Sequence, residues 1–308
     1  MKSIAPCQAA VCAIVVSYRP ESDFLARLTA IATQVDAIVI VDNASGNGYN
    51  DMFETLRGLK NLTLICNPEN YGIAQALNTG VRHAAATGYT WALLLDQDTS
   101  VDAQMIAHLA SVYADYPDKS RLAVIGAHFQ DRHRAQTDSD IAPINAPLWK
   151  EVEWVITSGS LMSIAAFTII GPFREDFFID FVDTEYCLRA RLAGFKIIRT
   201  ATVLMQHAIG LSTRHRIGKM QKWTSNHSPD RRYYITRNYT ILLRESGKHR
   251  FGLWAIRGCI ASLKSIKRIL FYEQNKTAKL NAVFEGWSDA LRGKTGKRQA
   301  ANTRSLRA

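Results

Sequence analysis

The segment that most constrains this chain is residues 91–98, with the sequence WALLLDQD. Its leucines form a short apolar run bounded by polar residues, which is typical of a strand buried on both faces of a sheet. Asp96 and Asp98 stand where this strand ends, and residues two apart on an extended backbone point to the same side. Open α/β sheets bind ligands beyond the carboxyl ends of their strands, so both carboxylates are expected at a ligand site.

Two carboxylates this close repel each other unless a cation lies between them. Oxygen ligands of this kind suit a hard divalent ion, Mg²⁺ or Mn²⁺, which can carry a phosphate group. We therefore predict that Asp96 and Asp98 hold a divalent metal. A solvated, Asp-rich turn after a strand would give the same local pattern, so the prediction depends on its context.

Strand-like and helical patterns alternate through the first hundred residues. Apolar runs typical of strands occupy residues 11–16, 37–41, 62–65 and 91–95. Helical patterns occupy residues 21–34, 50–58 and 73–86. Elements that alternate at this rhythm indicate βαβ units, and therefore an α/β fold with a mostly parallel sheet.

The second half of the chain is less regular. We predict helices at residues 102–114 and within 159–169, and a further helix capped by Thr184. Strands are expected at residues 123–126, 152–156, 195–198 and 202–205, with a loop at 131–147.

Charge is concentrated at the C-terminal end. The chain has 38 Lys and Arg against 27 Asp and Glu, a net charge of +11. Residues 246–308 hold 14 of the basic and 3 of the acidic residues, whereas residues 1–245 hold 24 of each. Such asymmetry points to an anionic membrane surface or a nucleic acid. The five scattered cysteines lack CxxC spacing, which favours a reducing compartment and argues against a disulfide framework or a zinc site.

Residues 251–272 mix apolar and basic side chains at helical spacing. The apolar residues recur at intervals of three and four: Leu253, Ile256, Ile260, Leu263, Ile266 and Leu270. Arg257, Lys264, Lys267 and Arg268 lie largely away from them. This pattern predicts a basic amphipathic helix suited to an anionic membrane, although a helix packed on the main domain would also fit. Residues 293–308 are basic and polar, and we expect them to be disordered.

The order of motifs resembles that of the family 2 inverting glycosyltransferases, which have the GT-A nucleotide-sugar-binding fold. Within that family the chain is most similar to bacterial rhamnosyltransferases that use dTDP-L-rhamnose. The resemblance covers about residues 10–245 and rests on residues 16–18, 41–45, 70–80, the DxD motif at 96–98, 157–160, 178–189 and His207.

This resemblance implies a GT-A catalytic domain at residues 8–245 and a basic helical extension at 246–308. It implies transfer of a rhamnosyl group from dTDP-L-rhamnose to a lipid-linked surface glycan, such as an O-antigen or capsule, in a bacterium. The enzyme is then expected in the cytoplasm, peripheral to the inner face of the plasma membrane. Another donor, such as a UDP-hexose, stays open.

The resemblance also implies the donor side of the site. Asp42 matches the acid that accepts the imide N–H of the base, although a turn-capping role is equally open. Asn70 and Gly72 match the loop that approaches the nucleotide and sugar. The remaining donor residues are Val16, Tyr18, Asn78 and Asp96, with a packing role open for Asn78.

Three residues are implied in metal binding. Asp98 matches the direct ligand of the divalent ion, with Asp96 and His207 beside it. A bound Mg²⁺ or Mn²⁺ would offset the charge that develops on the leaving diphosphate. A structural role for His207 stays open.

Asp183 matches the catalytic base, which takes a proton from the acceptor hydroxyl as that oxygen attacks the anomeric carbon. Many relatives have Glu-Asp here, whereas this chain has Val182-Asp183, which puts a role for a preceding acid in doubt. Glu185 is expected to orient the site or to face the acceptor. Thr157, Ser158 and Gly159 are expected on the acceptor side.

Basic and aromatic residues follow this region: Arg231, Arg232, Tyr233, Tyr234 and Arg237. They are expected either to bind the phosphates of the donor or the acceptor lipid, or to form a solvated helix face. A nucleic-acid-binding protein is the remaining alternative, suggested by the basic extension. The neutral first 245 residues and the absence of a recognised nucleic-acid module argue against it.

Overall fold

The structure, a computed structural model, describes residues 5–7, 10–131, 147–207, 213–217, 220–224, 226–246 and 251–299. For residues 131, 207, 213–217, 220–224, 246 and 251–259 it describes the backbone alone. The chain forms two compact units. Unit 1 comprises Met1–Arg174 and Val182–Ser212, and unit 2 comprises Glu175–Phe181 and Thr213–Ala308.

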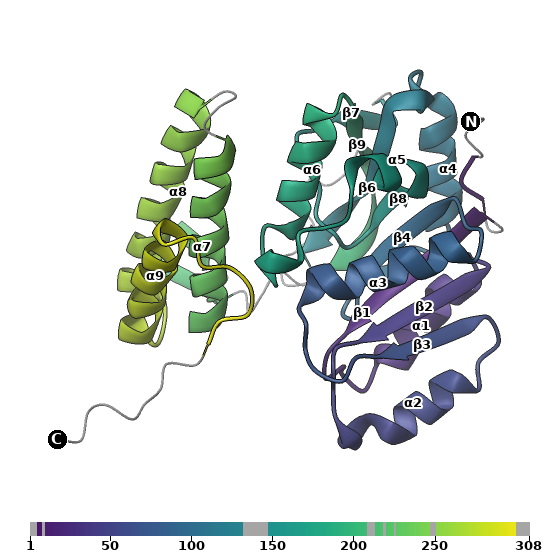
Figure 1. The fold of residues 1–308 in the computed structure, drawn as a ribbon, viewed down its shortest axis with the longest axis horizontal. Helices are drawn as coiled ribbons and strands as arrows, with labels where there is room; N and C mark the ends of the chain where they lie inside the picture. The colour runs from purple at the N-terminus through teal and green to yellow at the C-terminus, as the bar shows by residue number, and fades with distance from the viewer. Residues whose placement is uncertain are drawn as a thin grey trace. The chain divides into compact units, whose positions relative to one another are not determined.

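Unit 1 is built on a single mixed sheet whose strands lie in the order β3-β2-β1-β4-β8-β6-β9-β5, with β7 also beside β9 (Figure 1). The strands are β1 (Val11–Ser17), β2 (Ala37–Asp42), β3 (Leu62–Cys66), β4 (Trp91–Asp96), β5 (Ser100–Val101), β6 (Leu122–Asp131), β7 (Trp149–Glu151), β8 (Ser160–Ser163) and β9 (Lys196–His207). The strands β3, β2, β1 and β4 are parallel, as the βαβ pattern predicts. Strand β8 runs antiparallel to both β4 and β6.

Helices cover both faces of this sheet. They are α1 (Phe24–Ala32), α2 (Asn50–Arg57), α3 (Ile73–Ala86), α4 (Met105–Asp115), α5 (Ile164–Ile170) and α6 (Val182–Leu192), with short 3-10 helices η2 (Asn47–Tyr49) and η3 (Lys119–Arg121). Apolar residues of α1, α2 and α4 share one core cluster with alternate residues of β1. On the other face α3 packs closely on β1, because a Cβ at Gly80 would lie 2.3 Å from Ile14 Cγ2. Strand β1 is buried along its whole length for this reason.

The expectations for the second half need correction in four places. Residues 152–156 are not a strand, because pairing with β9 ends at Val152 and the chain then leaves the sheet. The chain after Gly159 first forms β8, since β4 and β6 supply hydrogen-bond partners on both sides, and α5 follows. The two strands expected at 195–205 are one strand, β9, with register shifts against β6. Helix α6 begins at Val182, two residues before the expected cap.

Unit 2 consists of the hairpin β10 (Thr213–Ile217) and β11 (Met220–Thr224), the 3-10 helix η5 (Glu175–Phe177), and α7 (Pro229–Ser246), α8 (Phe251–Tyr272) and α9 (Lys276–Leu291) (Figure 1). The bounds of α8 are those predicted. The expected boundary between a catalytic domain at 8–245 and an extension at 246–308 lies inside unit 2. Helix α7 belongs with the extension, because it packs against α9 and because Tyr233 and Ala282 lie in one buried cluster.

Part of the expected disordered tail is folded onto unit 2. The Gly296 N–H donates to the Asp176 carbonyl at 2.6 Å, and the Arg298 N–H donates to Tyr234 Oη at 2.7 Å. Arg298 also forms ion pairs with Asp230 and Glu285. The expectation is therefore wrong for residues 293–299, whereas residues 300–308 lie outside the described part of the chain. Among the described helices, none has the length and apolar character that crossing a membrane requires.

Candidate active site

The register of the parallel strands brings the acidic residues to one edge of the sheet. Ser17, at the end of β1, pairs with Asp42 at the end of β2. On the other side of β1, Val16 pairs with Asp96 at the end of β4. The strand ends that the sequence singled out are therefore neighbours at the carboxyl edge of unit 1, where α/β sheets bind their ligands.

Asp42 caps the turn that follows β2. Its carboxylate is 1% exposed and accepts three hydrogen bonds. Ser17 Oγ donates to Oδ1 at 2.9 Å, Ser45 Oγ donates to the same oxygen at 2.5 Å, and the Ser45 N–H donates to Oδ2 at 2.8 Å. The turn-capping role that the sequence left open is thus present. Contact with a nucleotide base stays a prediction, and such a base would have to share an engaged carboxylate.

The loop after β3 has the form expected for close approach to a ligand. Gly72, which precedes α3, has a φ of 89°, a left-handed conformation that glycine adopts without strain. Its N–H donates to Asn70 Oδ1 at 2.9 Å, and its carbonyl accepts a hydrogen bond from Asn43 Nδ2 at 3.1 Å. Asn70 therefore shapes the loop in addition to any contact with the donor.

Asn78 is a correction to the predicted donor site. The residue is 0% exposed, and its amide pairs with the backbone of Phe173. Nδ2 donates to the Phe173 carbonyl at 2.9 Å, and the Phe173 N–H donates to Oδ1 at 2.8 Å. A group buried in this way packs α3 against the segment before α6, so the structure supports the packing role that the sequence left open.

Gln97, the residue between the two acids of the DxD motif, was not assigned a role from the sequence. Its side-chain amide faces the backbone of Tyr18. Arg27 Nη1 donates to the backbone carbonyl of Gln97 at 3.2 Å. Arg27 is itself paired with Glu21 and Asp23. No local pattern signals this arrangement, because the partner of Gln97 lies at the end of another strand.

Ser158 and Gly159 are buried and hold the end of β4. The Asp96 N–H donates to Ser158 Oγ at 3.1 Å, and the Ser158 and Thr99 hydroxyls are hydrogen-bonded at 2.5 Å. The Gly159 N–H donates to the Leu94 carbonyl at 2.8 Å. Both residues therefore position the acidic strand end, whereas Thr157 is half-buried and lines a pocket. Contact of any of the three with an acceptor stays a prediction.

Two of the three predicted metal ligands lie together at the end of β4. Asp96 and Asp98 are half-buried at the end of β4. Strand β5 pairs with β9 so that Ser100 lies opposite Gln206, and this brings the backbone next to His207 close to the segment after Asp98. The His207 side chain lies outside the described residues. Among the side chains that are described, no three His, Cys, Asp or Glu residues gather to hold an ion.

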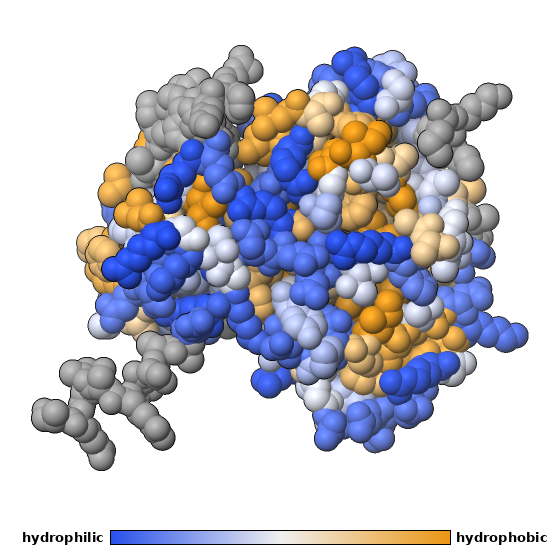
Figure 2. All heavy atoms as spheres, viewed as in Figure 1, coloured by the Kyte–Doolittle hydropathy of each residue, from blue (hydrophilic) through white to orange (hydrophobic). Residues whose placement is uncertain are grey.

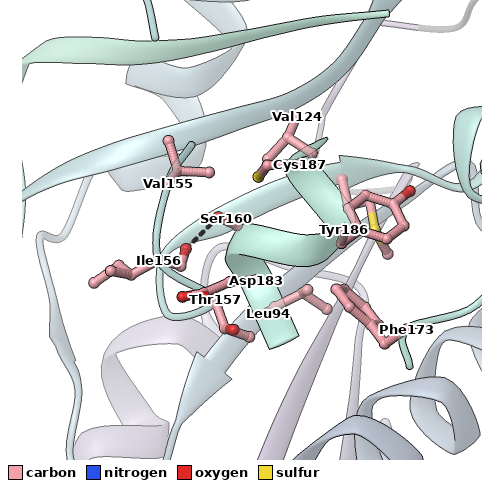
Figure 3. A pocket seen from close by; sticks show the side chains of 11 residues that line it. Leu94, Val124, Val155, Ile156, Thr157, Ser160, Phe173, Asp183, Tyr186 and Cys187 are labelled. Carbon is pink, nitrogen blue, oxygen red and sulfur yellow. Dashed lines mark hydrogen bonds between the residues drawn. The ribbon is translucent and has the colours of Figure 1, made fainter. Parts of the chain in front are cut away.

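Asp183 lies in the first turn of α6, partly buried. Its Oδ1 accepts hydrogen bonds from the Thr184 N–H at 2.7 Å and from Thr184 Oγ1 at 3.3 Å. The helix N-terminus favours a charged carboxylate at this position. In Figure 3 the carboxylate lies beside Thr157 at one end of a pocket. This arrangement can hold an ionised acid next to a space that a substrate could enter.

The pocket beside Asp183 is small and almost entirely apolar. Its volume is about 20 Å³. Burial raises the pKa of the Cys187 thiol in its wall to about 12, so this group stays a neutral thiol near pH 7. The pocket is lined by Leu94, Val124, Val155, Ile156, Thr157, Ser160, Met162, Phe173, Asp183, Tyr186 and Cys187.

Glu185 is an orienting residue rather than a free acid at the acceptor side. It is buried and forms a two-point ion pair with Arg189, with Nε to Oε1 at 2.6 Å and Nη2 to Oε2 at 2.9 Å. Arg189 also donates to the carbonyls of Ile170 and Pro172. The pair therefore ties α6 to the end of α5, which is one of the two roles expected from the sequence.

The three arginines of α7 singled out in the sequence make contacts inside unit 2, and Arg232 and Arg237 are buried there, so a solvated face does not describe these two. The side chain of Arg231 is 41% exposed, and contact with a phosphate stays a prediction. Arg237 is 0% exposed, and its Nη atoms donate to the carbonyls of Phe177 and Gly296. Arg231 Nη2 donates to Asp180 Oδ1 at 2.5 Å. These contacts hold the segment that precedes α6, because each carbonyl or carboxylate satisfies a charged donor.

Arg232 belongs to a second buried cluster. It pairs with Glu273 at 2.5 Å, and Lys279 pairs with the other oxygen of that carboxylate at 2.9 Å. His227 lies beside this cluster. Burial, together with the charges of Arg231, Arg232 and Lys279, lowers its pKa from 6.5 to about 3. The histidine is therefore neutral near pH 7.

Comparisons with known proteins agree with this architecture. A family model described as glycosyl transferase family 2 matches residues 12–173. The dTDP-rhamnosyl transferase RfbF of Shigella flexneri is 30% identical over 298 residues, which cover 92% of this chain and 96% of that protein.

Solved structures resemble the fold at lower identity. The structure of S. aureus TarS 1-349 has a TM-score of 0.57 and 14% identity, and covers 91% of this chain and 80% of its own. GalNAc-T7, crystallised with UDP, GalNAc and Mn²⁺, has a TM-score of 0.54 and 13% identity. The match covers 92% of this chain and 56% of the GalNAc-T7 chain. At such identity these two structures support the shared fold alone.

Proposed function

Because the chain belongs to glycosyltransferase family 2 and is a glycosyltransferase with the GT-A fold, we propose that it transfers a rhamnosyl group from dTDP-L-rhamnose. The observation that carries this proposal is the similarity to a dTDP-rhamnosyl transferase over nearly the full length of both chains. The acceptor is a glycan built on a lipid carrier, and transfer inverts the anomeric carbon.

Asp183 is the proposed base. Its carboxylate accepts the proton of the acceptor hydroxyl while that oxygen forms a bond to the anomeric carbon. The bond from this carbon to the diphosphate oxygen breaks, and the nucleoside diphosphate leaves with the electron pair. Support comes from the position of Asp183 at the pocket, in the first turn of α6, where the helix N-terminus favours a charged carboxylate.

The donor is proposed to bind at the strand ends formed by Val16, Tyr18, Asp42 and Asp96, with Asn70 and Gly72 approaching from the next loop. Asp98, with Asp96 and His207, is proposed to hold Mg²⁺ or Mn²⁺, and the presence of Mn²⁺ in the GalNAc-T7 structure supports a metal in this fold. Two carboxylates and an imidazole suit such an ion. The bound ion would stabilise the negative charge of the departing diphosphate.

We test the donor by incubating the purified chain with dTDP-L-rhamnose, UDP-glucose and UDP-N-acetylglucosamine, each with a lipid-linked glycan extract. Product masses identify the transferred sugar, and the anomeric configuration is read by NMR. A product heavier by one deoxyhexose, with inverted configuration, is expected. Transfer from a UDP-hexose with no transfer from dTDP-L-rhamnose would contradict the proposal.

A lipid-linked acceptor requires an enzyme at a membrane, and α8 supports this location. Its residues Ile260, Leu263, Leu270 and Phe271 are exposed, the second and fourth at 67% each. They recur at helical intervals on one face, and Lys264 and Lys267 fall on the same face. In Figure 2 apolar side chains reach the surface of unit 2 among hydrophilic ones.

This arrangement differs from the expected separation of apolar and basic faces. The side of α8 that packs inward carries Ile269, and both this residue and Glu273, directly after the helix, are buried. The exposed face therefore mixes apolar and cationic groups, which suits the boundary between lipid headgroups and acyl chains. We propose that this face binds the anionic inner leaflet of a bacterial plasma membrane from the cytoplasm.

Surface substitutions test this proposal better than removal of residues 246–308, which would expose the buried face of α7. The double variant Leu263→Gln, Phe271→Gln should lose most binding to vesicles that contain anionic lipid. Lys264→Gln should weaken it about fivefold, since a lysine at such a surface contributes about 1 kcal/mol. The control is Leu192→Gln, at an exposed leucine of α6 in unit 1. Equal sedimentation of all variants with the vesicles would contradict the membrane role.

A further inference from the structure

The pocket beside Asp183 has room for one small group. Its volume is only about 20 Å³, whereas pockets for whole small-molecule ligands measure roughly 300–1,000 Å³. Its walls come from six separate parts of unit 1: the end of β4, strand β6, strand β8, the segment 155–157, Phe173, and the first turns of α6. Since these elements are tightly packed, the space cannot expand cheaply to admit a second heavy atom.

The chemistry of the walls favours an apolar occupant. Ser160 donates its hydroxyl hydrogen to the Ile156 carbonyl at 2.6 Å. In Figure 3 the Tyr186 hydroxyl points away from Thr157 and Asp183. The polar groups of Thr157 and Asp183 lie together at one end of the pocket. A hydroxyl pushed past them would lose its hydrogen bonds to water and find few in return.

We propose that this pocket receives the C6 methyl group of a 6-deoxyhexosyl unit, and so selects a deoxysugar against the hexose that carries a C6 hydroxymethyl. The methyl group fills the space with apolar contacts. The hydroxymethyl adds one heavy atom and a hydroxyl, which costs more to bury than a methyl group because most of the wall is apolar. The proposal rests on the proposed function in one respect, since Asp183 must lie at the reacting carbon for a sugar substituent to reach the pocket.

The methyl group could belong to the donor or to the terminal sugar of the acceptor, because both sugars meet at the base. The test therefore has two arms. The donor arm compares dTDP-L-rhamnose with dTDP-L-mannose, its 6-hydroxy counterpart, and with dTDP-L-lyxose, which lacks carbon six. The acceptor arm compares glycans whose terminal sugar carries or lacks the methyl group.

The first variant is Val124→Ile, which adds one methylene to the pocket wall from β6. It should lower kcat/KM for the methyl-bearing substrate while leaving that for the substrate without carbon six nearly unchanged. The second variant is Val155→Thr, which keeps the shape of the wall and adds a hydroxyl. It should narrow the preference for the deoxysugar over the hexose, which in the unmodified protein is expected to be about 10- to 200-fold.

Val112→Ile is the matched control, because Val112 is buried in α4 and does not line the pocket. Melting temperatures of all variants verify that they fold. The measured quantity in each arm is the ratio of kcat/KM for the methyl-bearing substrate to kcat/KM for the substrate that lacks the methyl group. If Val124→Ile changes this ratio in one arm and Val112→Ile does not, the proposal is supported and the methyl group belongs to the substrate varied in that arm. Ratios that stay constant in both arms overturn it. If dTDP-L-rhamnose is no donor at all, the proposed function fails, and the acceptor arm with the true donor still decides the role of the pocket.

Discussion

Gln97 and Tyr18 are joined by two hydrogen bonds across 79 positions of sequence. The Tyr18 N–H donates to Gln97 Oε1 at 2.8 Å, and Gln97 Nε2 donates to the Tyr18 carbonyl at 3.2 Å. The glutamine side chain thus pairs with the backbone as a neighbouring strand would. It locks the segment between Asp96 and Asp98 to the end of β1, so the two parts of the proposed donor site keep a fixed spacing.

Gln97→Ala should therefore raise the donor KM about tenfold and leave kcat nearly unchanged. Loss of two hydrogen bonds of about 0.5–1.5 kcal/mol each loosens the donor site without touching the base. Gln104→Ala, at an exposed glutamine before α4, is the control. Initial rates over a range of donor concentrations provide the measurement. An unchanged donor KM would show that this pairing does not organise the site.

Asp183→Asn should lower turnover by about 10²- to 10⁴-fold, the usual contribution of a general base, while donor binding is kept. The amide keeps the shape of the side chain but cannot accept the proton. Donor affinity by calorimetry and transfer rate are measured on the same variant. Asp51→Asn, at an exposed aspartate of α2, is the control. Near-normal turnover would place the base elsewhere, and a collapse of donor binding would place Asp183 in the nucleotide site.

Asp98→Ala should abolish the dependence of donor binding on Mg²⁺ or Mn²⁺, since the proposed direct ligand is lost. The control is Asp102→Ala, which removes an exposed carboxylate four residues further along. Calorimetric titration of each variant with the donor, in the presence and absence of the ion, measures this dependence. Full transfer activity of the unmodified protein in excess EDTA would rule out a required metal.

Asn238→Asp should destabilise unit 2. Its Nδ2 donates to the carbonyls of Phe177, Ile179 and Asp180, at 2.9, 2.8 and 2.9 Å. The loop they form holds Phe178, Asp180 and Phe181 at φ near 64°, where non-glycine residues are strained.

A carboxylate at position 238 would face three carbonyl oxygens, and each lost hydrogen bond in a buried site costs about 1–3 kcal/mol. The urea unfolding midpoint should fall clearly below that of the exposed-site control Asn281→Asp. Equal midpoints would mean that the loop holds its conformation without this amide.

Acid should destabilise unit 2 through His227. Its pKa is about 3 in the folded protein against 6.5 for the free side chain, so between these values the unfolded chain binds one more proton. Stability therefore falls as the pH drops from about 6.5 toward 3. His227→Gln should flatten this part of the stability curve, whereas His108→Gln, at an exposed site, should not. Parallel curves for His227→Gln and the unmodified protein would contradict the assignment.

Local patterns in the sequence predict the strands and helices that depend mainly on neighbouring residues. Apolar runs bounded by turn residues predicted β1 to β4 to within about a residue, because burial on both faces needs an unbroken apolar segment. The same reasoning placed the acids at a strand end, and helical spacing predicted α8. Resemblance to a family supplied Asp183, which no pattern of spacing singles out.

The contacts between distant side chains depend on the folded arrangement of the whole chain. Asn78 pairs with Phe173 across 95 positions, and Gln97 pairs with Tyr18 across 79. Neither pairing produces a periodic pattern of residues that could be recognised in the sequence. Residues 160–163 became a strand because β4 and β6 offered hydrogen-bond partners on both sides. Packing against α7 and α9 in unit 2 determines which face of α8 is buried. In each case the deciding energy is a contact between distant segments, which exists only once the chain has folded.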